Sequence, residues 1–495
     1  MMRSLYSGIS GLSVHQTKMD VIGNNIANVN TVGFKGSKVS FSDVFYQTIQ
    51  SATGPNETTG AAGQNAMQIG LGSTVSSIVS SPTKTGGAQR TDNPFDIMIN
   101  GDSFFVVNQG GTNYFTKAGN FKVDANGTLA TTSGGTVMGW QVDPKDPTKT
   151  VADVVSPLKI MSPENLYSTP IATSAATISG NIDSKDTQLA IGGSGKTVNI
   201  SFYDSLGQKY NASIKLMHNT TGTAPNVTDV DNQYTVQLVD VLDSNGKSIY
   251  KTGSGTAADP YKETSVKPIS FGGIEYTLDT ATGNLKQYTT GALPVVTFNA
   301  STGEFVSAIG SGTDNGTGTD SNKSLNFSIT DTSTAGSPFH NITVDFSTIT
   351  MFAGSGKTNV GFTPGDLENK GAGRTAGNMT GLSVDSAGKI YGTYDNGDNR
   401  LLGQIAVASF SNPAGLEAVG GNLFAETQNS GKFDGIGKDV SSDGGSFTTG
   451  VLEMSNVDLA SEFTEMITTQ RGFQANSRII TTSDTLLEEL INLKR

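Results

Sequence analysis

The C-terminal segment of the chain, residues 455–495, reads SNVDLASEFTEMITTQRGFQANSRIITTSDTLLEELINLKR. Apolar residues recur in it at seven-residue spacing, which in an α-helix places them on one slowly drifting stripe. The stripe consists of Leu459, Met466, Phe473, Ile480 and Leu487, and Phe463 widens it. Ser455 or Asn456 is expected as the N-cap, and Lys494 and Arg495 end the segment as the helix dipole favours. The segment predicts a long amphipathic helix.

The N-terminal segment carries a similar pattern. Its apolar residues at the same interval are Leu5, Leu12, Met19 and Ile26, supported by Ile9 and Ile22. Glycines within this segment each lower helix stability by about 1 kcal/mol relative to alanine, so we expect the helix to form mainly when it packs against others. Matching helices at opposite ends of a 495-residue chain predict that the two ends meet, with the intervening residues forming an inserted body.

Composition limits the function classes. Hydrophobic residues make up 35% of the chain, and 61 glycines favour β-rich domains with many turns. A net charge of -12 argues against nucleic-acid binding, which normally needs a basic surface. The chain has no cysteine, which excludes disulfides, cysteine-ligated zinc and thiol catalysis.

No catalytic, cofactor or metal site is expected. His15, His218 and His340 lie far apart and lack carboxylates at metal-ligand spacing. Phosphate-loop, nucleophile-elbow and zinc-protease motifs are absent from the sequence. Aspartate-rich turns such as Asp240 with Asp243 lack the full calcium-loop pattern, so hairpin turns are the better interpretation. The sequence has no apolar run long enough for a transmembrane helix, and its N-terminus lacks the features of a cleaved secretory signal.

The body between the terminal segments predicts mainly antiparallel β-structure. Residues 35–85 are expected to form an extended connector, with a short helix at Phe41–Ile49 and a possible hairpin near Met67–Val79. Alternating runs and Asn-Gly turns predict one discontinuous β domain from residues 86–160 and 366–454. Residues 161–365 predict one or two outermost β domains, possibly with a subdomain near 210–330. The fold class is therefore multidomain α+β, with a coiled-coil-like inner domain from residues 1–34 and 455–495.

Residues 27–35, ANVNTVGFK, end the first predicted helix and resemble the signature of the axial proteins of the bacterial flagellum. The signature positions are Ala27, Asn28, Asn30, Thr31, Gly33, Phe34 and Lys35. Asn and Gly tolerate left-handed backbone and end helices, which gives a physical reason for these residue types. The C-terminal segment resembles the end of hook and distal-rod proteins, and TDNPFDIMINGDSFFVV at 91–107 resembles their first outer domain.

This resemblance implies a structural subunit of the flagellar hook that polymerises with itself into a curved tube and transmits torque. It implies as partners the distal rod, hook cap and hook–filament junction proteins and the type III export apparatus, at an extracellular location. Two alternatives stay open: a distal rod subunit of the basal body, which is expected to lack a large insertion at 161–365, and a surface adhesin with the β body as its binding head.

Overall fold

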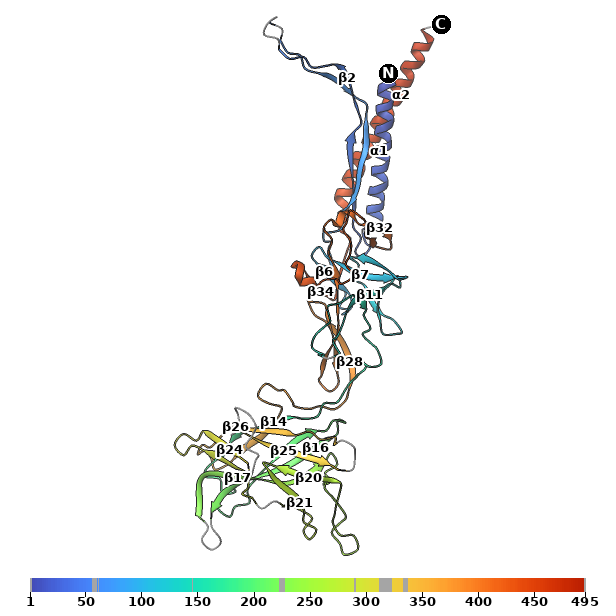
Figure 1. Cartoon of the computed structure of the whole chain (residues 1–495). Helices are drawn as coiled ribbons and strands as arrows, with labels where there is room; N and C mark the ends of the chain where they lie inside the picture. Colours follow the sequence, from blue (N-terminus) through green and yellow to red (C-terminus); the bar gives the residue numbers. More distant parts are fainter. Residues whose placement is uncertain are drawn as a thin grey trace. The chain divides into compact units, whose positions relative to one another are not determined.

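The computed structural model describes residues 2–55, 60, 62–144, 146–221, 228–288, 291–310, 323–332 and 337–493. The chain divides into two compact units. Unit 1 comprises Met1–Leu166, Met379–Thr393 and Asn399–Arg495, and unit 2 comprises Tyr167–Asn378 and Tyr394–Asp398. An N-terminal and a C-terminal helix flank a mostly antiparallel β-rich body, coloured from blue to red along the chain in Figure 1. No helix in the described part of the chain is long and apolar enough to cross a membrane.

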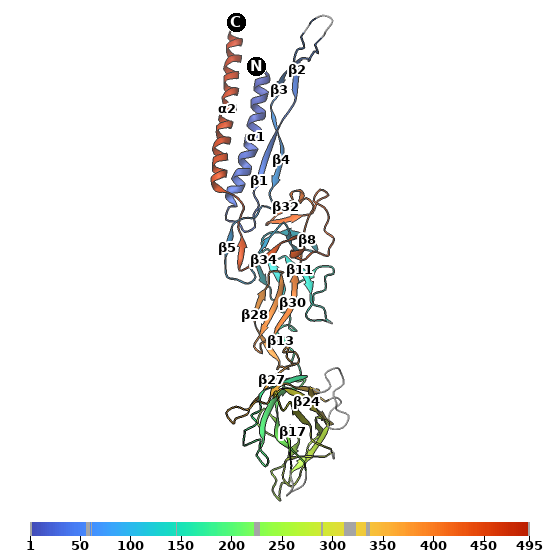
Figure 2. The same cartoon turned by 90° about the vertical axis from the view of Figure 1, so that its left-hand side faces the viewer.

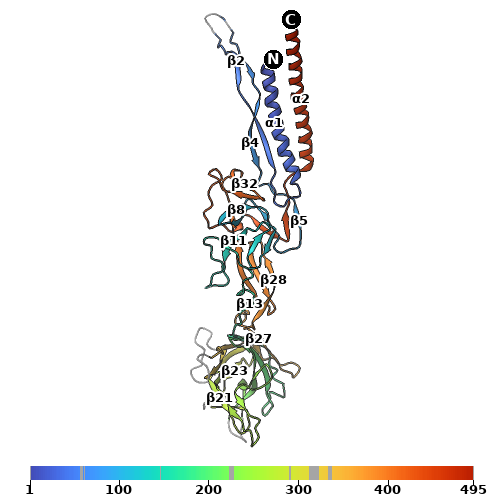
Figure 3. The ribbon, with the colours of Figure 1, turned by 90° about the vertical axis from the view of Figure 1, so that its right-hand side faces the viewer.

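The two helices of unit 1, α1 (Met2–Ala27) and α2 (Leu459–Asn492), lie side by side and antiparallel (Figures 2 and 3). Their direction follows from their contacts, since Gly8 lies against Ile480 and His15 against Gly472. The N-cap of α2 is Asp458, whose carboxylate accepts hydrogen bonds from the N–H groups of Ala460 and Ser461. The predicted N-cap at Ser455 or Asn456 was therefore wrong, and the predicted terminal residues Lys494 and Arg495 lie outside the described residues.

Residues 37–50 and 67–80 form a two-stranded ribbon, and its strands β1 (Ser37–Asp43) and β4 (Ser73–Ser80) contact α1. Strand β1 pairs with β4, and β2 (Tyr46–Gln50) pairs with β3 (Met67–Gly70). Hydrogen bonds from Val44 N–H to the Gly72 carbonyl and from Leu71 N–H to the Phe45 carbonyl join the two pairs. The short helix predicted at Phe41–Ile49 is therefore absent, because those residues pair with strands further along the chain. The hairpin predicted near Met67–Val79 is also wrong. β3 and β4 do not pair with each other, because β3 pairs with β2 and β4 pairs with β1.

The β body of unit 1 combines strands from two distant parts of the sequence. Strand β11 pairs with β30 on one side and β7 on the other, and β33 pairs with β8. Two hydrophobic clusters pack around this sheet, one centred on Phe105 and the other on Phe104. The strands that lie wholly or mainly in unit 1, apart from the ribbon, are β5 (Ala88–Arg90), β6 (Ile97–Asn100), β7 (Phe104–Gln109), β8 (Thr112–Thr116), β9 (Phe121–Val123), β10 (Leu129–Thr131), β11 (Thr136–Gln141), β12 (Ser156–Pro157), β28 (Gly377–Val384), β29 (Lys389–Tyr394), β30 (Asn399–Ile405), β31 (Val407–Ala408), β32 (Glu417–Gly420), β33 (Leu423–Ala425), β34 (Ser446–Thr449) and β35 (Val451–Glu453).

Unit 2 contains a seven-stranded sheet in the order β22-β21-β20-β25-β26-β14-β27 and a five-stranded sheet in the order β15-β16-β17-β23-β24. One hydrophobic cluster holds buried residues from both sheets, among them Phe271 and Leu238. The pair β14–β26 is parallel. The strands are β13 (Tyr167–Ser168), β14 (Ala175–Asn181), β15 (Lys196–Tyr203), β16 (Lys209–Thr221), β17 (Thr228–Asp243), β18 (Lys251–Thr252), β19 (Lys262–Glu263), β20 (Val266–Phe271), β21 (Ile274–Leu278), β22 (Leu285–Gln287), β23 (Val295–Phe298), β24 (Phe305–Ile309), β25 (Ser324–Asp331), β26 (Ile342–Thr350) and β27 (Asn359–Pro364).

A polar contact inside this core joins strand β17 to a buried tyrosine. The pairing of β16 with β17 shifts register next to Leu238, and the Leu238 N–H donates to the Tyr276 hydroxyl at 3.3 Å. Tyr276 is fully buried, and burial raises the pKa of its hydroxyl. The phenol oxygen therefore satisfies a backbone donor that the strand ladder leaves unpaired.

We expect Tyr276→Phe to lower the free energy of unfolding of unit 2 by about 1–3 kcal/mol, because it leaves the buried Leu238 N–H without an acceptor. Tyr288→Phe, at an exposed position of the same unit, is the matched control and should change little. Denaturant unfolding of the full chain measures both. Equal stability of the two variants would contradict this role of the Tyr276 hydroxyl.

Candidate assembly interface

Glycines shape the contact between α1 and α2. A Cβ atom on Gly11 would lie 2.5 Å from Nδ2 of Asn476, and one on Gly472 would lie 2.7 Å from Nε2 of His15. Both distances are too short for a real side chain, so each glycine forms a notch that receives a polar side chain of the other helix. Gly11 and Gly472, which lower helix propensity, therefore permit close approach of the two helices.

The residues of the predicted apolar stripes are mostly not fully buried in a single copy. On α2, the half-buried stripe residues are Met466, Phe473, Ile480 and Leu487, while Leu459 and Phe463 are exposed. On α1, Ile22 is buried, the half-buried positions are Leu5, Leu12, Met19 and Ile26, and Ile9 is exposed. Among the described residues of α2, only Thr469 and Ser483 are buried, and both are small and polar. Sequence reasoning missed Val14, which is buried on α1 outside the predicted stripe.

Large apolar side chains stay exposed on both the helices and the ribbon. On the helices they include Tyr6, Ile467, Ile479, Leu486, Leu490, Ile491 and Leu493. On the ribbon they include Phe41, Val44, Phe45, Tyr46, Ile49, Met67, Ile69, Ile78 and Val79. A group of large exposed apolar side chains on a folded chain favours a site of protein contact. This end of unit 1 is therefore the candidate site for association with other chains.

The signature residues that follow α1 form a turn that contacts the β body. Ala27 ends α1, and Asn28 binds Thr31, whose hydroxyl donates to Asn28 Oδ1 at 3.1 Å. Gly33 has a φ of 69°, and its N–H donates to the carbonyl of Glu453 at 2.8 Å. A Cβ on Gly33 would lie 2.7 Å from the backbone nitrogen of Ala118, which explains the glycine.

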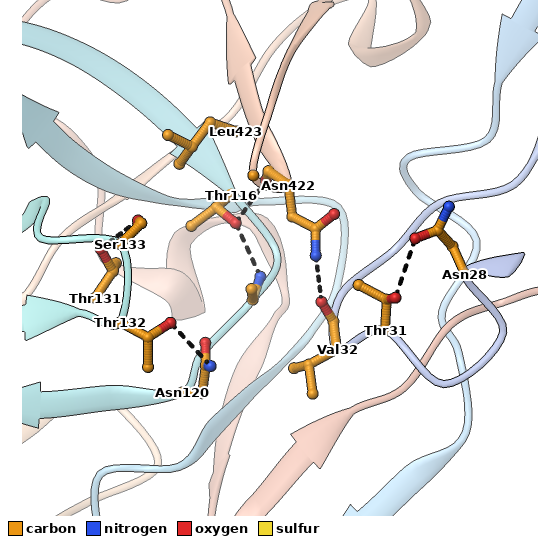
Figure 4. A pocket seen from close by; sticks show the side chains of 12 residues that line it. Asn28, Thr31, Val32, Thr116, Asn120, Thr131, Thr132, Ser133, Asn422 and Leu423 are labelled. Atoms are coloured by element: carbon orange, nitrogen blue, oxygen red, sulfur yellow. Dashed lines mark hydrogen bonds between the residues drawn. The ribbon is translucent and has the colours of Figure 1, made fainter. Parts of the chain in front are cut away.

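An open pocket of about 570 Å³ lies beside this turn, and Figure 4 shows its lining. The Asn422 amide reaches across and donates to the Val32 carbonyl at 2.7 Å. Hydroxyl and amide groups dominate the lining, including those of Thr116, Asn120 and Thr132. Of the other signature residues, Phe34 is half-buried and Asn30 is exposed.

Lys35, the last signature residue, forms a buried ion pair with Glu453. Its Nζ lies 2.6 Å from Oε1 of Glu453, and both side chains are fully buried. Lys35 also donates to the Lys84 carbonyl at 2.8 Å, and Gly86 N–H donates to the same Glu453 oxygen at 2.9 Å. The pair joins the residues that follow α1 to β35, which leads into α2, and to the segment after the ribbon.

Two asparagines extend this joint to the helices themselves. Asn25 exchanges hydrogen bonds with the Ser37 backbone and donates to Glu462 of α2 at 3.2 Å. Asn456 accepts a hydrogen bond from Gly36 N–H at 2.8 Å. Burial raises the pKa of the Glu462 carboxyl. The sequence placed Asn25 next to the signature segment without assigning it a contact, and it gave no signal for Glu453.

A second buried lysine lies in the β body. Lys117 is fully buried, donates to the Gly101 carbonyl at 2.6 Å and lies 5.0 Å from the centroid of the Phe104 ring. Burial, followed by the positive charge of Lys35, lowers the pKa of the Lys117 amine to about 8. The folded state therefore disfavours the charge on this side chain.

In the described part of the chain, no three histidine, aspartate or glutamate side chains form a group that could hold a metal ion. His15 lies between α2 and the ribbon, with its ring 6.1 Å from the Phe41 ring in an edge-on arrangement. In one aspartate-rich turn, Asp243 accepts hydrogen bonds from the N–H groups of Asn245 and Lys247, each at 2.8 Å. That carboxylate is thus occupied in closing a hairpin.

Three protein-family models match the chain. Residues 5–35 match "Flagella basal body rod protein", residues 98–196 match "Flagellar hook protein FlgE/F/G D1 domain", and residues 448–493 match "Flagellar basal body rod FlgEFG protein C-terminal". The two end segments are those that carry α1, the signature turn and α2. The family models therefore cover the same residues that build the joint and the helix pair.

Similarity to individual proteins extends over the whole chain. The flagellar hook protein FlgE of Borreliella burgdorferi is 35% identical and that of Treponema pallidum 33% identical, each with all of both chains covered. The chain belongs to the flagellar hook protein FlgE family. A flagellar basal-body rod protein FlgG of Bacillus subtilis is 28% identical, also over the full length of both chains.

We expect Lys35→Met to destabilise unit 1 by about 3–5 kcal/mol, because it leaves the buried Glu453 carboxylate without a counter-charge. The double variant Lys35→Met, Glu453→Met removes both charges and should recover most of that loss. Denaturant unfolding of the single and double variants gives the comparison. If the double variant is as unstable as the single one, the uncompensated charge is not the cause.

We expect Lys117→Met to stabilise unit 1 at neutral pH and to remove one pH dependence. The folded-state pKa of Lys117, about 8, lies below its ordinary value of 10.5, so the folded state favours the neutral amine. Between pH 8 and pH 10.5 the unfolded chain binds more protons at this amine than the folded chain does. The free energy of unfolding of the native chain should therefore rise as pH increases across that range. The variant should lack this rise, measured by denaturant unfolding across that range. Parallel pH profiles for both proteins would contradict the assignment.

Proposed function

We propose that this chain is the structural subunit of the flagellar hook and polymerises with itself into a curved, flexible tube that transmits torque from the rod to the filament. One observation carries the proposal: the longest helix of the chain leaves most of its apolar side chains half-buried or exposed in a single copy. Whole-length similarity to FlgE proteins supports the same conclusion. The similar proteins are structural parts of the flagellum, and no catalytic role is proposed.

The proposed assembly uses the terminal helices as a common inner core. Residues 1–34 and 455–495 form this inner domain, in which α1 and α2 pack in coiled-coil fashion with each other and with neighbouring copies. The predicted stripe residues are its polymerisation contacts, and the exposed apolar side chains of both helices support this role. Residues 35–85 bridge to neighbours, while residues 86–160 with 366–454, and residues 161–365 with a subdivision near 210–330, form outer domains.

Folding and assembly are coupled in this proposal. Helix stability in proteins comes mainly from packing of an apolar face rather than from intrinsic propensity. In a single copy, α2 has one helix along part of one side and no buried apolar side chain among its described residues. Neighbouring copies supply the missing contacts, so polymer grows where such contacts are available.

The proposed partners follow from the family. They are further copies of the chain, the distal rod, hook cap and hook–filament junction proteins, and the type III export apparatus. The proposed location is the extracellular flagellar hook and basal body, reached without a cleaved signal peptide.

The second candidate function is a distal rod subunit. It is supported by the full-length similarity to a basal-body rod protein and by family models that describe rod proteins. Higher identity to hook proteins favours the hook. The two candidates differ in polymer shape, since a hook is curved and a rod is straight.

We expect the purified full-length chain to form short curved tubes in electron micrographs above a threshold concentration. Circular dichroism should show greater helicity in the polymer than in the monomer, because α1, with 26 residues, and α2, with 34, gain their packing partners on assembly. Leu490→Glu should raise the threshold concentration, since it places a charge in an apolar contact. The exposed β-body variant Glu417→Gln is the control.

Straight tubes would favour the rod candidate. A monomer as helical as the polymer would contradict coupled folding, and a chain that stays monomeric at every concentration would contradict both assembly functions.

A further inference from the structure

Four asparagines in the described part of the chain are directly followed by glycine, at residues 100–101, 126–127, 245–246 and 396–397. A fifth such pair, at 315–316, lies outside the described residues. Asparagine is chemically labile before glycine, because no side chain hinders the attack of the glycine nitrogen on the asparagine side-chain carbonyl. Whether the attack occurs in the folded chain then depends on how firmly the fold holds each pair.

Three of these pairs lie in turns of one kind. In each turn, the glycine N–H donates to the carbonyl three residues earlier, at 3.0 Å for Gly127, 3.1 Å for Gly246 and 3.0 Å for Gly397. A second backbone hydrogen bond joins the first and fifth residues of each turn, at 2.9, 2.8 and 3.0 Å in the same order. The three glycines have φ angles between 76° and 80°. The turns are therefore matched, and the sites differ only in contacts beyond the turn.

Asn126 is held through the glycine that follows it. Gly127 is buried, and its carbonyl accepts hydrogen bonds from the N–H groups of Ile160 at 2.8 Å and Met161 at 3.0 Å. A Cβ atom on Gly127 would overlap the Met161 carbonyl oxygen, so the glycine is packed against a second segment of the β body. Opening this turn must also break that contact.

Asn396 and Asn100 are held through their own side chains. Asn396 is half-buried, its Nδ2 donates to the Thr375 carbonyl at 2.8 Å, and its Oδ1 accepts from the Asp398 N–H at 3.0 Å. Asn100 ends strand β6, and its Nδ2 donates to the Thr448 hydroxyl at 2.8 Å. Each side-chain amide must leave its hydrogen-bond partners before the next nitrogen can reach it.

Asn245 lacks these additional contacts. It lies with Gly246 in the turn that ends β17, and both residues are exposed. A Cβ atom on Gly246 would meet no other atom within 4 Å. Among the described residues, the Asn245 side chain makes no hydrogen bond, and only its backbone N–H is engaged, with Asp243. Opening this turn therefore breaks only the hydrogen bonds of the turn itself.

The reaction that this geometry permits needs only the chain and water. The Gly246 nitrogen gives its proton to hydroxide and forms a bond to Cγ of Asn245. The bond from Cγ to Nδ2 then breaks, and the amide leaves as ammonia after taking a proton from water. Water next adds to one carbonyl of the five-membered imide ring and opens it. The product is aspartate, or isoaspartate when the backbone continues through the side-chain carbon.

We propose that Asn245 is a site of spontaneous deamidation in the folded chain, whereas the fold protects Asn100, Asn126 and Asn396. This inference goes beyond the proposed function, because it concerns a covalent reaction of the single chain and holds for a hook or a rod subunit alike.

Deamidation changes the turn in two ways. Both products add a carboxylate beside that of Asp243, so like charges come close together. In isoaspartate the backbone is one carbon longer, which alters the spacing with which the N–H groups of residues 245 and 247 now share the Asp243 carboxylate. The modified turn is therefore more negative and less tightly closed.

Peptide mapping by mass spectrometry tests the proposal on the full-length chain kept at mildly alkaline pH, where more glycine nitrogen is deprotonated. We expect the peptide with Asn245 to deamidate several-fold faster than those with Asn100, Asn126 and Asn396, which serve as internal controls. An isoaspartate-specific methyltransferase should label the same peptide. Equal or faster deamidation at any of the three controls would overturn the proposal.

The chain unfolded in denaturant provides the matched control, because all four pairs then keep the same dipeptide without the fold. The four rates should become similar there. If Asn245 stays several-fold faster in denaturant, the neighbouring sequence and not the structure sets the ranking, and the proposal fails. Asn245→Gln, at an exposed position, should remove the modification at this site and leave the other sites unchanged. The proposed function stands or falls separately, since none of these measurements requires a polymer.

Discussion

The ion pair between Lys35 and Glu453 joins the two ends of the chain at one point. Lys35 follows α1 and Glu453 precedes α2, so this contact, with both side chains fully buried, ties the bases of both helices together. A buried ion pair persists only where further hydrogen bonds offset the loss of hydration. Here the Gly86 N–H donates to Oε1 of Glu453 and the Lys84 carbonyl accepts from Lys35, while Oε2 of Glu453 is buried without a partner among the described residues. These bonds add the segment after the ribbon to the same joint. The antiparallel helix pair depends on this anchor for its position on the β body.

Beyond this ion pair, α2 has no buried apolar side chain among its described residues in a single copy. Its contact with α1 is close, because Gly11 and Gly472 let the helices approach, yet its apolar side chains remain half-buried or exposed. The helix is thus held at its base and contacts α1 along one side, while its other sides are exposed. Such an arrangement suits a subunit that gains stability when copies of itself supply the missing surface.

The β body and unit 2 differ from the helices in this respect. Phe104, Phe105 and Phe271 are completely buried, and each unit closes its own hydrophobic clusters. These parts need no second copy to bury their cores. The β units thus bury their own cores, whereas α2 has no buried apolar side chain among its described residues.

Local patterns were enough to predict both helices, the turn after Ala27 and strands such as Phe104–Gln109, because periodic burial and turn residues leave a signal within a few positions. The segment Phe41–Ile49 was mispredicted as a helix, since its apolar spacing fits either structure and only pairing with β3 and β4 makes it a ribbon. The partners of Lys35 and Gly11 were decided by the tertiary structure alone. No local pattern relates Lys35 to a glutamate 418 residues away, and the notch at Gly11 exists only because the register of α2 brings Asn476 against it.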